Sequence, residues 1–113
     1  MIFLSYSSHD RRIAMALVDK FNQAGLNVWF DCLSLNLNLP IYPQLKNAIL
    51  NSTIVCLIDS QYSRNSSWVS LELEVQACNA IPLISFFPEQ CVSKVPTLFA
   101  EFLPNNLISA SSV

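Results

Sequence analysis

A tryptophan and a glutamate stand four residues apart in the segment NSSWVSLELE, at Trp68 and Glu72. Residues with this spacing lie on one face of a helix, so the indole and the carboxylate are expected to be neighbours. A helix facing only solvent does not require the tryptophan, and a helix facing only the core does not favour the glutamate. A carboxylate in such a place can stabilise positive charge on a bound group or accept hydrogen bonds from its hydroxyls. Glu72 is therefore the candidate catalytic residue, and Glu74, on another face of the same helix, is its natural comparison.

The segments that would position these side chains are short apolar runs that alternate with helical patterns. Four runs predict buried strands, namely MIFLSY, NVWF, TIVCLI and IPLISFF, and NLIS near residue 107 is a fifth, weaker one. Continuous apolar strands that alternate with helices predict a parallel sheet with helices on both faces. Ligands of such sheets bind beyond the carboxyl ends of the strands, where we expect the loops YSSHDRR, DCLSLNLNLP and DSQYSRNSSW to gather.

Three helices are predicted between the strands. Ser7 can cap the first helix with Asp10 as its capping-box partner, and Gly25 stands where that helix needs a C-terminal cap. The other two helices are predicted at residues 45–49 and from Trp68 to residue 77 or 79. Loops are predicted at residues 32–43 and 59–67.

The composition argues against several classes of function. The chain of 113 residues has a net charge of −2 and no cluster of Lys or Arg, so nucleic acid is not an expected partner. No apolar run reaches the roughly 18 residues that a membrane span needs. The start, MIFLSYSSHD, lacks the basic residues of a signal peptide, so we expect a cytoplasmic protein without membrane contact. The four cysteines form no CxxC pair and His9 is the single histidine, so core cysteines and no metal site are predicted.

Three segments, correctly spaced over about residues 1–87, resemble the Toll/interleukin-1 receptor (TIR) domain. They are IFLSYSSHD, GLNVWFD and AILNSTIVCLIDSQYSRNSSWVSLEL. The resemblance implies a flavodoxin-like α/β fold, a three-layer sandwich whose parallel five-stranded sheet has helices on both faces. The final SASSV offers no last helix. The resemblance also implies that residues 1–113 are one TIR domain, the N-terminal effector module of a longer protein with a fused or partner sensor domain.

In many TIR domains of the bacterial NAD-cleaving type, a glutamate four residues after a tryptophan is catalytic, and Glu72 holds that position here. The resemblance thus implies cleavage of the nicotinamide–ribose bond of NAD⁺, to ADP-ribose or a cyclic product, with the carboxylate beside the ribose. NAD⁺ is then the substrate, and no cofactor is expected. The implied substrate-binding residues are Tyr6, Ser7, Ser8, Arg11, Trp29 and Trp68.

The resemblance further implies activation by self-association with other TIR domains, in an effector of bacterial antiviral defence. The loop after the second strand mediates such contacts in many members and usually carries a glycine. LSLNLNLPIYP has none, but asparagine tolerates the same left-handed backbone. The leucines of this loop would form an exposed apolar patch. The predicted self-association loop comprises Leu35, Leu37, Asn38, Leu39 and Pro40.

Purely structural interpretations and other functions stay open. The structural roles are packing for Trp29 and Trp68, a cap for Ser7, and solvated positions for His9, Arg11 and Glu72. A non-enzymatic TIR scaffold that works by assembly alone is the main alternative function. An enzyme similar to nucleoside deoxyribosyltransferases is a further one, which the VWFD and SWVSLEL motifs disfavour.

Overall fold

The computed structural model describes residues 1–30 and 37–89, and its centre is a parallel sheet. Within these residues, four strands form the sheet, in the order β2-β1-β3-β4. They are β1 (Ile2–Ser5), β2 (Val28–Trp29), β3 (Ile54–Ile58) and β4 (Leu83–Phe86). This arrangement confirms the predicted parallel α/β architecture, while the predicted fifth strand near residue 107 lies outside the described residues.

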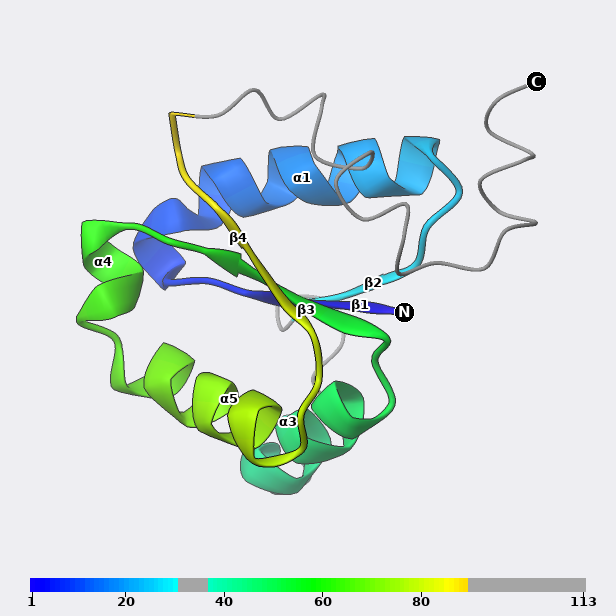
Figure 1. The fold of residues 1–113 in the computed structure, drawn as a ribbon, viewed down its shortest axis with the longest axis vertical. Helices are drawn as coiled ribbons and strands as arrows, with labels where there is room; N and C mark the ends of the chain where they lie inside the picture. Colours follow the sequence, from blue (N-terminus) through cyan, green and yellow to red (C-terminus); the bar gives the residue numbers. More distant parts are fainter. Residues whose placement is uncertain (31–36, 90–113) are drawn as a thin grey trace.

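Helices cover both faces of the sheet and give the molecule three layers (Figure 1). The helical segments are η1 (Ser8–Asp10, a 3₁₀ turn), α1 (Arg11–Gln23), α3 (Ile41–Leu50), α4 (Gln61–Arg64) and α5 (Ser67–Cys78). In Figure 1, α1 lies on one face, α3 and α5 lie on the other, and the short α4 lies near one end of the sheet. Among the described residues, no helix has both the length and the apolarity that a membrane crossing requires.

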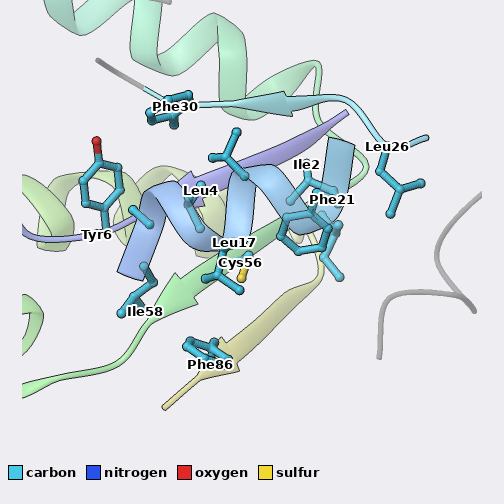
Figure 2. Close-up of a cluster of buried hydrophobic side chains, with 13 residues drawn as sticks. Ile2, Leu4, Tyr6, Leu17, Phe21, Leu26, Phe30, Cys56, Ile58 and Phe86 are labelled. Atoms are coloured by element: carbon cyan, nitrogen blue, oxygen red, sulfur yellow. The ribbon is translucent and has the colours of Figure 1, made fainter. Parts of the chain in front are cut away.

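Alternation along the strands divides the core between the two faces. In β1, Ile2 and Leu4 pack toward α1, whereas Phe3 packs toward α3 and α5. Figure 2 shows the α1 side, where Leu17 and Phe21 lie with these strand residues. β1 and β3 are buried along their whole length because strands flank them on both sides and helices cover them.

The helix predicted at residues 45–49 is present but begins earlier, inside the predicted loop 32–43, and the loop predicted at residues 59–67 contains a helix that was not predicted. α3 begins at Ile41, so Pro43 lies in its first turn, where proline costs no intrahelical hydrogen bond. α4 lies within the segment predicted as a polar loop, and a capping box at Ser60 and Ser63 holds it. The predicted C-terminal cap of the first helix is confirmed, since Gly25 has a φ of +80°.

Candidate active site

A cleft of about 900 Å³ opens beyond the carboxyl ends of β1 and β3. This is where ligands bind in open parallel sheets. One wall follows β1 and consists of Tyr6, Ser7, Ser8, His9 and Arg11. The other wall follows β3 and consists of Gln61, Tyr62, Asn65, Ser66, Ser67 and Trp68, and Leu37 joins the lining from the segment before α3.

The wall after β1 is shaped by Ser7, which acts as a helix cap. Its Oγ accepts a hydrogen bond from the backbone N–H of His9 at 3.3 Å, and its carbonyl accepts from the N–H of Asp10 at 2.8 Å. Ser7 is buried, whereas Ser8 and Arg11 are exposed. The prediction that Ser7 caps a helix is thus confirmed, although it caps the 3₁₀ turn rather than α1.

The carboxylate of Asp10 links the two walls. The Oγ of Ser60 donates a 2.5 Å hydrogen bond to Asp10 Oδ2, and both side chains are buried. The same Ser60 oxygen accepts from the N–H groups of Tyr62 and Ser63 and so caps α4. Asp10 therefore fixes the loop after β1 to the loop after β3, and this contact takes the place of the capping-box role predicted for it.

Glu72 lies behind the cleft, in the interior. Its Oε1 accepts a 2.9 Å hydrogen bond from the Oγ of Ser5, the last residue of β1, and the glutamate is only 3% exposed. The interpretation of Glu72 as a solvated residue is therefore wrong, whereas Glu74 is exposed. Glu72 is not among the residues that line the cleft. It is flanked by residues that do, because Ser5 precedes Tyr6 and Trp68 lies one turn earlier on α5.

The two predicted tryptophans occupy different places. Trp68 lines the cleft and also packs against the core beneath α3 and α5. Trp29 stacks on Phe3, with ring centroids 5.0 Å apart and an interplanar angle of 10°. Trp29 is half-buried in β2 and is not among the lining residues. The structure thus brings Trp68 together with the residues after β1, but it places Trp29 in a core contact.

The described part of the predicted self-association loop is open to solvent. Leu37 is 79% exposed and Leu39 is 55% exposed, and Asn38 and Pro40 are exposed as well. Leu35 lies outside the described residues. Leu37 also lines the cleft, so the segment 37–40 meets the cleft at this residue.

One aromatic contact across the cleft was not predicted from the sequence. The rings of His9 and Tyr62 stack with centroids 4.7 Å apart and an interplanar angle of 11°. His9 is exposed as predicted, but its position against Tyr62 makes it part of the cleft. Nothing in the spacing of the two residues predicts this contact, because it joins loops that follow different strands.

The charge and chemistry of the described lining suit an anionic ligand with hydroxyl groups. Arg11 is the cation of the lining, and none of the described lining residues is acidic. The carboxylates of Asp10 and Glu72 lie behind this surface and are buried. No group of three or more potential metal ligands exists among residues 1–30 and 37–89.

Comparisons with known proteins identify the family. A family model described as TIR domain matches residues 2–109. A comparison with curated protein sequences finds no match. A similar solved structure is "Structure of the activated Roq1 resistosome directly recognizing the pathogen effector XopQ (TIR domains)", with 20% sequence identity and a TM-score of 0.67 over 98% of this chain and 74% of that chain. This likeness supports the fold, and the family model decides between a TIR domain and a deoxyribosyltransferase-like enzyme. Because that model spans nearly the whole length, the chain belongs to the TIR domain family.

Proposed function

We propose that this domain cleaves the nicotinamide–ribose bond of NAD⁺, with Glu72 as its catalytic residue. One observation carries the proposal. The carboxylate of Glu72 is held by Ser5 directly behind a cleft, and the neighbours of both residues line that cleft. A buried carboxylate is costly, so its retention beside a cleft is typical of a functional site.

The cleft has the size and the groups that a dinucleotide requires. Its volume of about 900 Å³ lies within the range of small-molecule sites. The hydroxyls of Ser7 and Ser8 can bond to ribose, and the guanidinium of Arg11 can pair with the pyrophosphate. The indole of Trp68 can pack against the nicotinamide ring next to Glu72.

The reaction needs little more than stabilisation of charge. When the bond between ribose C1′ and the nicotinamide nitrogen breaks, its electron pair leaves with neutral nicotinamide, and positive charge develops on the ribose. The carboxylate of Glu72 would stabilise that charge or hold the ribose hydroxyls. Water then adds to C1′ and loses a proton, which gives ADP-ribose. An adenine or ribose atom of the same molecule in place of water gives a cyclic product.

Burial of Glu72 provides a reason for activation by assembly. At 3% exposure the carboxylate reaches a ribose only after side chains at the cleft move. Leu37 belongs both to the cleft and to the exposed segment 37–40, so contact with another TIR domain through this segment would shift a cleft wall. The Roq1 structure is described as an activated resistosome that recognizes a pathogen effector. That description supports a defence role through assembly, which we propose to be antiviral defence in a bacterium, with a fused or partner sensor domain and a cytoplasmic location.

The test is NAD⁺ consumption by concentrated protein, with and without a clustering agent. We expect clustering to raise the rate of nicotinamide release and Leu39→Ser to lower both assembly and release. Leu50→Ser is the matched control, because Leu50 is also exposed but lies at the far end of α3. Absence of cleavage in samples whose assembly is verified by light scattering would overturn the proposal.

A non-enzymatic scaffold is the second candidate, and the same glutamate favours it. A carboxylate that is buried and hydrogen-bonded to Ser5 fits a purely structural role, and the exposed leucines at 37 and 39 suffice for assembly. The scaffold predicts assembly without nicotinamide release by the unmodified protein.

A further inference from the structure

The stacked rings of His9 and Tyr62 form an exposed aromatic surface in the cleft. His9 comes from η1 and Tyr62 from α4, so two loops that follow different strands both contribute to it. Tyr62 is 44% exposed and His9 is exposed, so each ring presents surface to solvent beyond the face that the other covers. Core packing does not account for an aromatic pair in this position.

A flat aromatic surface of this kind suits the planar base of a nucleotide. Bases stack on aromatic side chains regardless of their identity, because every base has a π-face. The amide of Gln61 stands next to Tyr62 in the same wall and offers both a donor and an acceptor to the edge of a base. On the opposite wall, Arg11 follows His9 by two residues and can meet a phosphate attached to the same nucleoside.

The cleft contains a second aromatic surface, and the two differ in their neighbours. Trp68 lies on α5 one turn before Glu72, whereas Tyr62 lies on the preceding helix, α4. A dinucleotide such as NAD⁺ has two bases, and the base that is cleaved off, nicotinamide, must lie beside the carboxylate. We propose that Trp68 receives the nicotinamide end and that the His9–Tyr62 pair is the binding site for the adenine ring. This inference rests on the proposed function for the identity of the nucleotide.

AMP and ribose 5-phosphate provide the test, because they differ only by the adenine base. Their affinities are measured by ligand-observed NMR titration, which detects weak binding and requires no catalysis. We expect Tyr62→Leu to weaken AMP binding by about 5-fold or more, the effect of removing one base–aromatic stack. The same substitution should weaken the binding of ribose 5-phosphate much less. Tyr62→Phe keeps the ring and should retain AMP binding.

Tyr42→Leu is the matched control, because Tyr42 is also 44% exposed but lies on α3 outside the cleft. Its AMP affinity should equal that of the unmodified protein. The inference is overturned if Tyr62→Leu leaves AMP binding unchanged, or if it weakens AMP and ribose 5-phosphate equally.

Measuring NAD⁺ cleavage on the same samples separates this inference from the proposed function. Binding of AMP that depends on Tyr62, without any cleavage of NAD⁺, supports the adenine site and contradicts the enzyme. Cleavage of NAD⁺ together with an AMP affinity that Tyr62→Leu does not change supports the proposed NAD⁺ cleavage and contradicts the adenine site.

Discussion

The Ser5–Glu72 contact joins the end of β1 to α5, and the His9–Tyr62 contact joins η1 to α4, but the two contacts are built in opposite ways. Ser5 and Glu72 are buried and share a hydrogen bond across 67 residues of sequence. His9 and Tyr62 are exposed and touch through their ring faces. A hydrogen bond in the interior is strong and its loss is costly, whereas an exposed ring contact contributes little to stability. The buried contact therefore fixes the side chain of Glu72 in place, whereas the exposed contact leaves ring surface open to solvent.

The Asp10–Ser60 hydrogen bond lies between these extremes. It crosses the same two loops and is buried, yet its partners belong to the loops rather than to the sheet and α5. Its place indicates a positioning role, because it sets the separation of the walls that carry His9 and Tyr62. The three contacts differ in burial and in the elements that they join. We expect the loss of folding stability on breaking each contact to follow the same order.

The largest effect is expected in the rates at which two cysteines react with iodoacetamide. These rates test whether the sheet near Ser5 is closed to water. Cys56 pairs in register with Leu4, and burial raises the pKa of its thiol from 9.0 to about 12. Cys78, at the end of α5, is exposed. At pH 8 we expect iodoacetamide to modify Cys78 at least about a thousandfold faster, since so little of Cys56 is thiolate. Peptide mass spectrometry measures both rates, and equal rates would contradict the burial.

The raised pKa of Cys56 also makes the stability of the folded protein depend on pH. Because the pKa of Cys56 is higher in the folded protein than in the unfolded chain, its contribution to stability is fully present below about pH 9. That contribution is lost as the pH rises from about 9 to about 12. Cys56→Ala should remove this part of the alkaline destabilisation in urea titrations, and an unchanged pH profile would contradict the assignment.

Removal of the Glu72 side chain should have the next largest effect. We expect Glu72→Ala to lower the free energy of unfolding by roughly 2–4 kcal/mol, because it leaves the Ser5 hydroxyl unpaired beside a cavity. Glu72→Gln keeps an oxygen at the place of Oε1 and should cost less than about 1 kcal/mol. Urea denaturation measures both values. A cost below about 0.5 kcal/mol for Glu72→Ala would show that the Ser5–Glu72 contact is not structural.

The Asp10–Ser60 bond should give an intermediate effect. Asp10→Ala is expected to cost about 1–3 kcal/mol, because it removes the charge-assisted partner of a buried hydroxyl. A double-mutant cycle with Ser60→Ala tests whether the two residues act together. Additive losses in that cycle would mean that the hydrogen bond contributes nothing.

Tyr62→Leu should have the smallest effect on stability. The ring is exposed and its contact with His9 is exposed, so we expect a change of less than about 0.5 kcal/mol in urea denaturation. A loss as large as that of Glu72→Ala would remove the distinction between the buried and the exposed contact.

Most of the fold could be predicted because its signals are local. The apolar runs of β1 and β3, the cap at Ser7 and the left-handed Gly25 all follow from neighbouring residues. The early start of α3 and the unpredicted helix α4 have physical reasons. Pro43 suggested a loop, yet the first turn of α3 tolerates proline, and α4 depends on the capping box at Ser60 rather than on apolar periodicity.

The candidate site was predictable only in part, because its contacts join distant segments. The spacing of Trp68 and Glu72 predicted a shared face of α5, and the cleft does lie where the strand ends meet. No local pattern could predict that Ser5 bonds to Glu72 or that His9 stacks on Tyr62. Trp29 was expected beside the substrate but lies against Phe3. Side chains of a strand alternate between the two faces of the sheet, so the position of a residue in the strand decides which face it contacts.

The most direct test of the account compares Glu72→Gln with Glu74→Gln in an NAD⁺ cleavage assay on concentrated, assembled protein. Both substitutions replace a carboxyl group of α5 with an amide, but Glu72 is buried and Glu74 is exposed. We expect Glu72→Gln to lower nicotinamide release by at least about 100-fold while the protein stays folded, and Glu74→Gln to leave the release unchanged. Cleavage that survives Glu72→Gln, or assembled wild-type protein that releases no nicotinamide, would contradict this expectation.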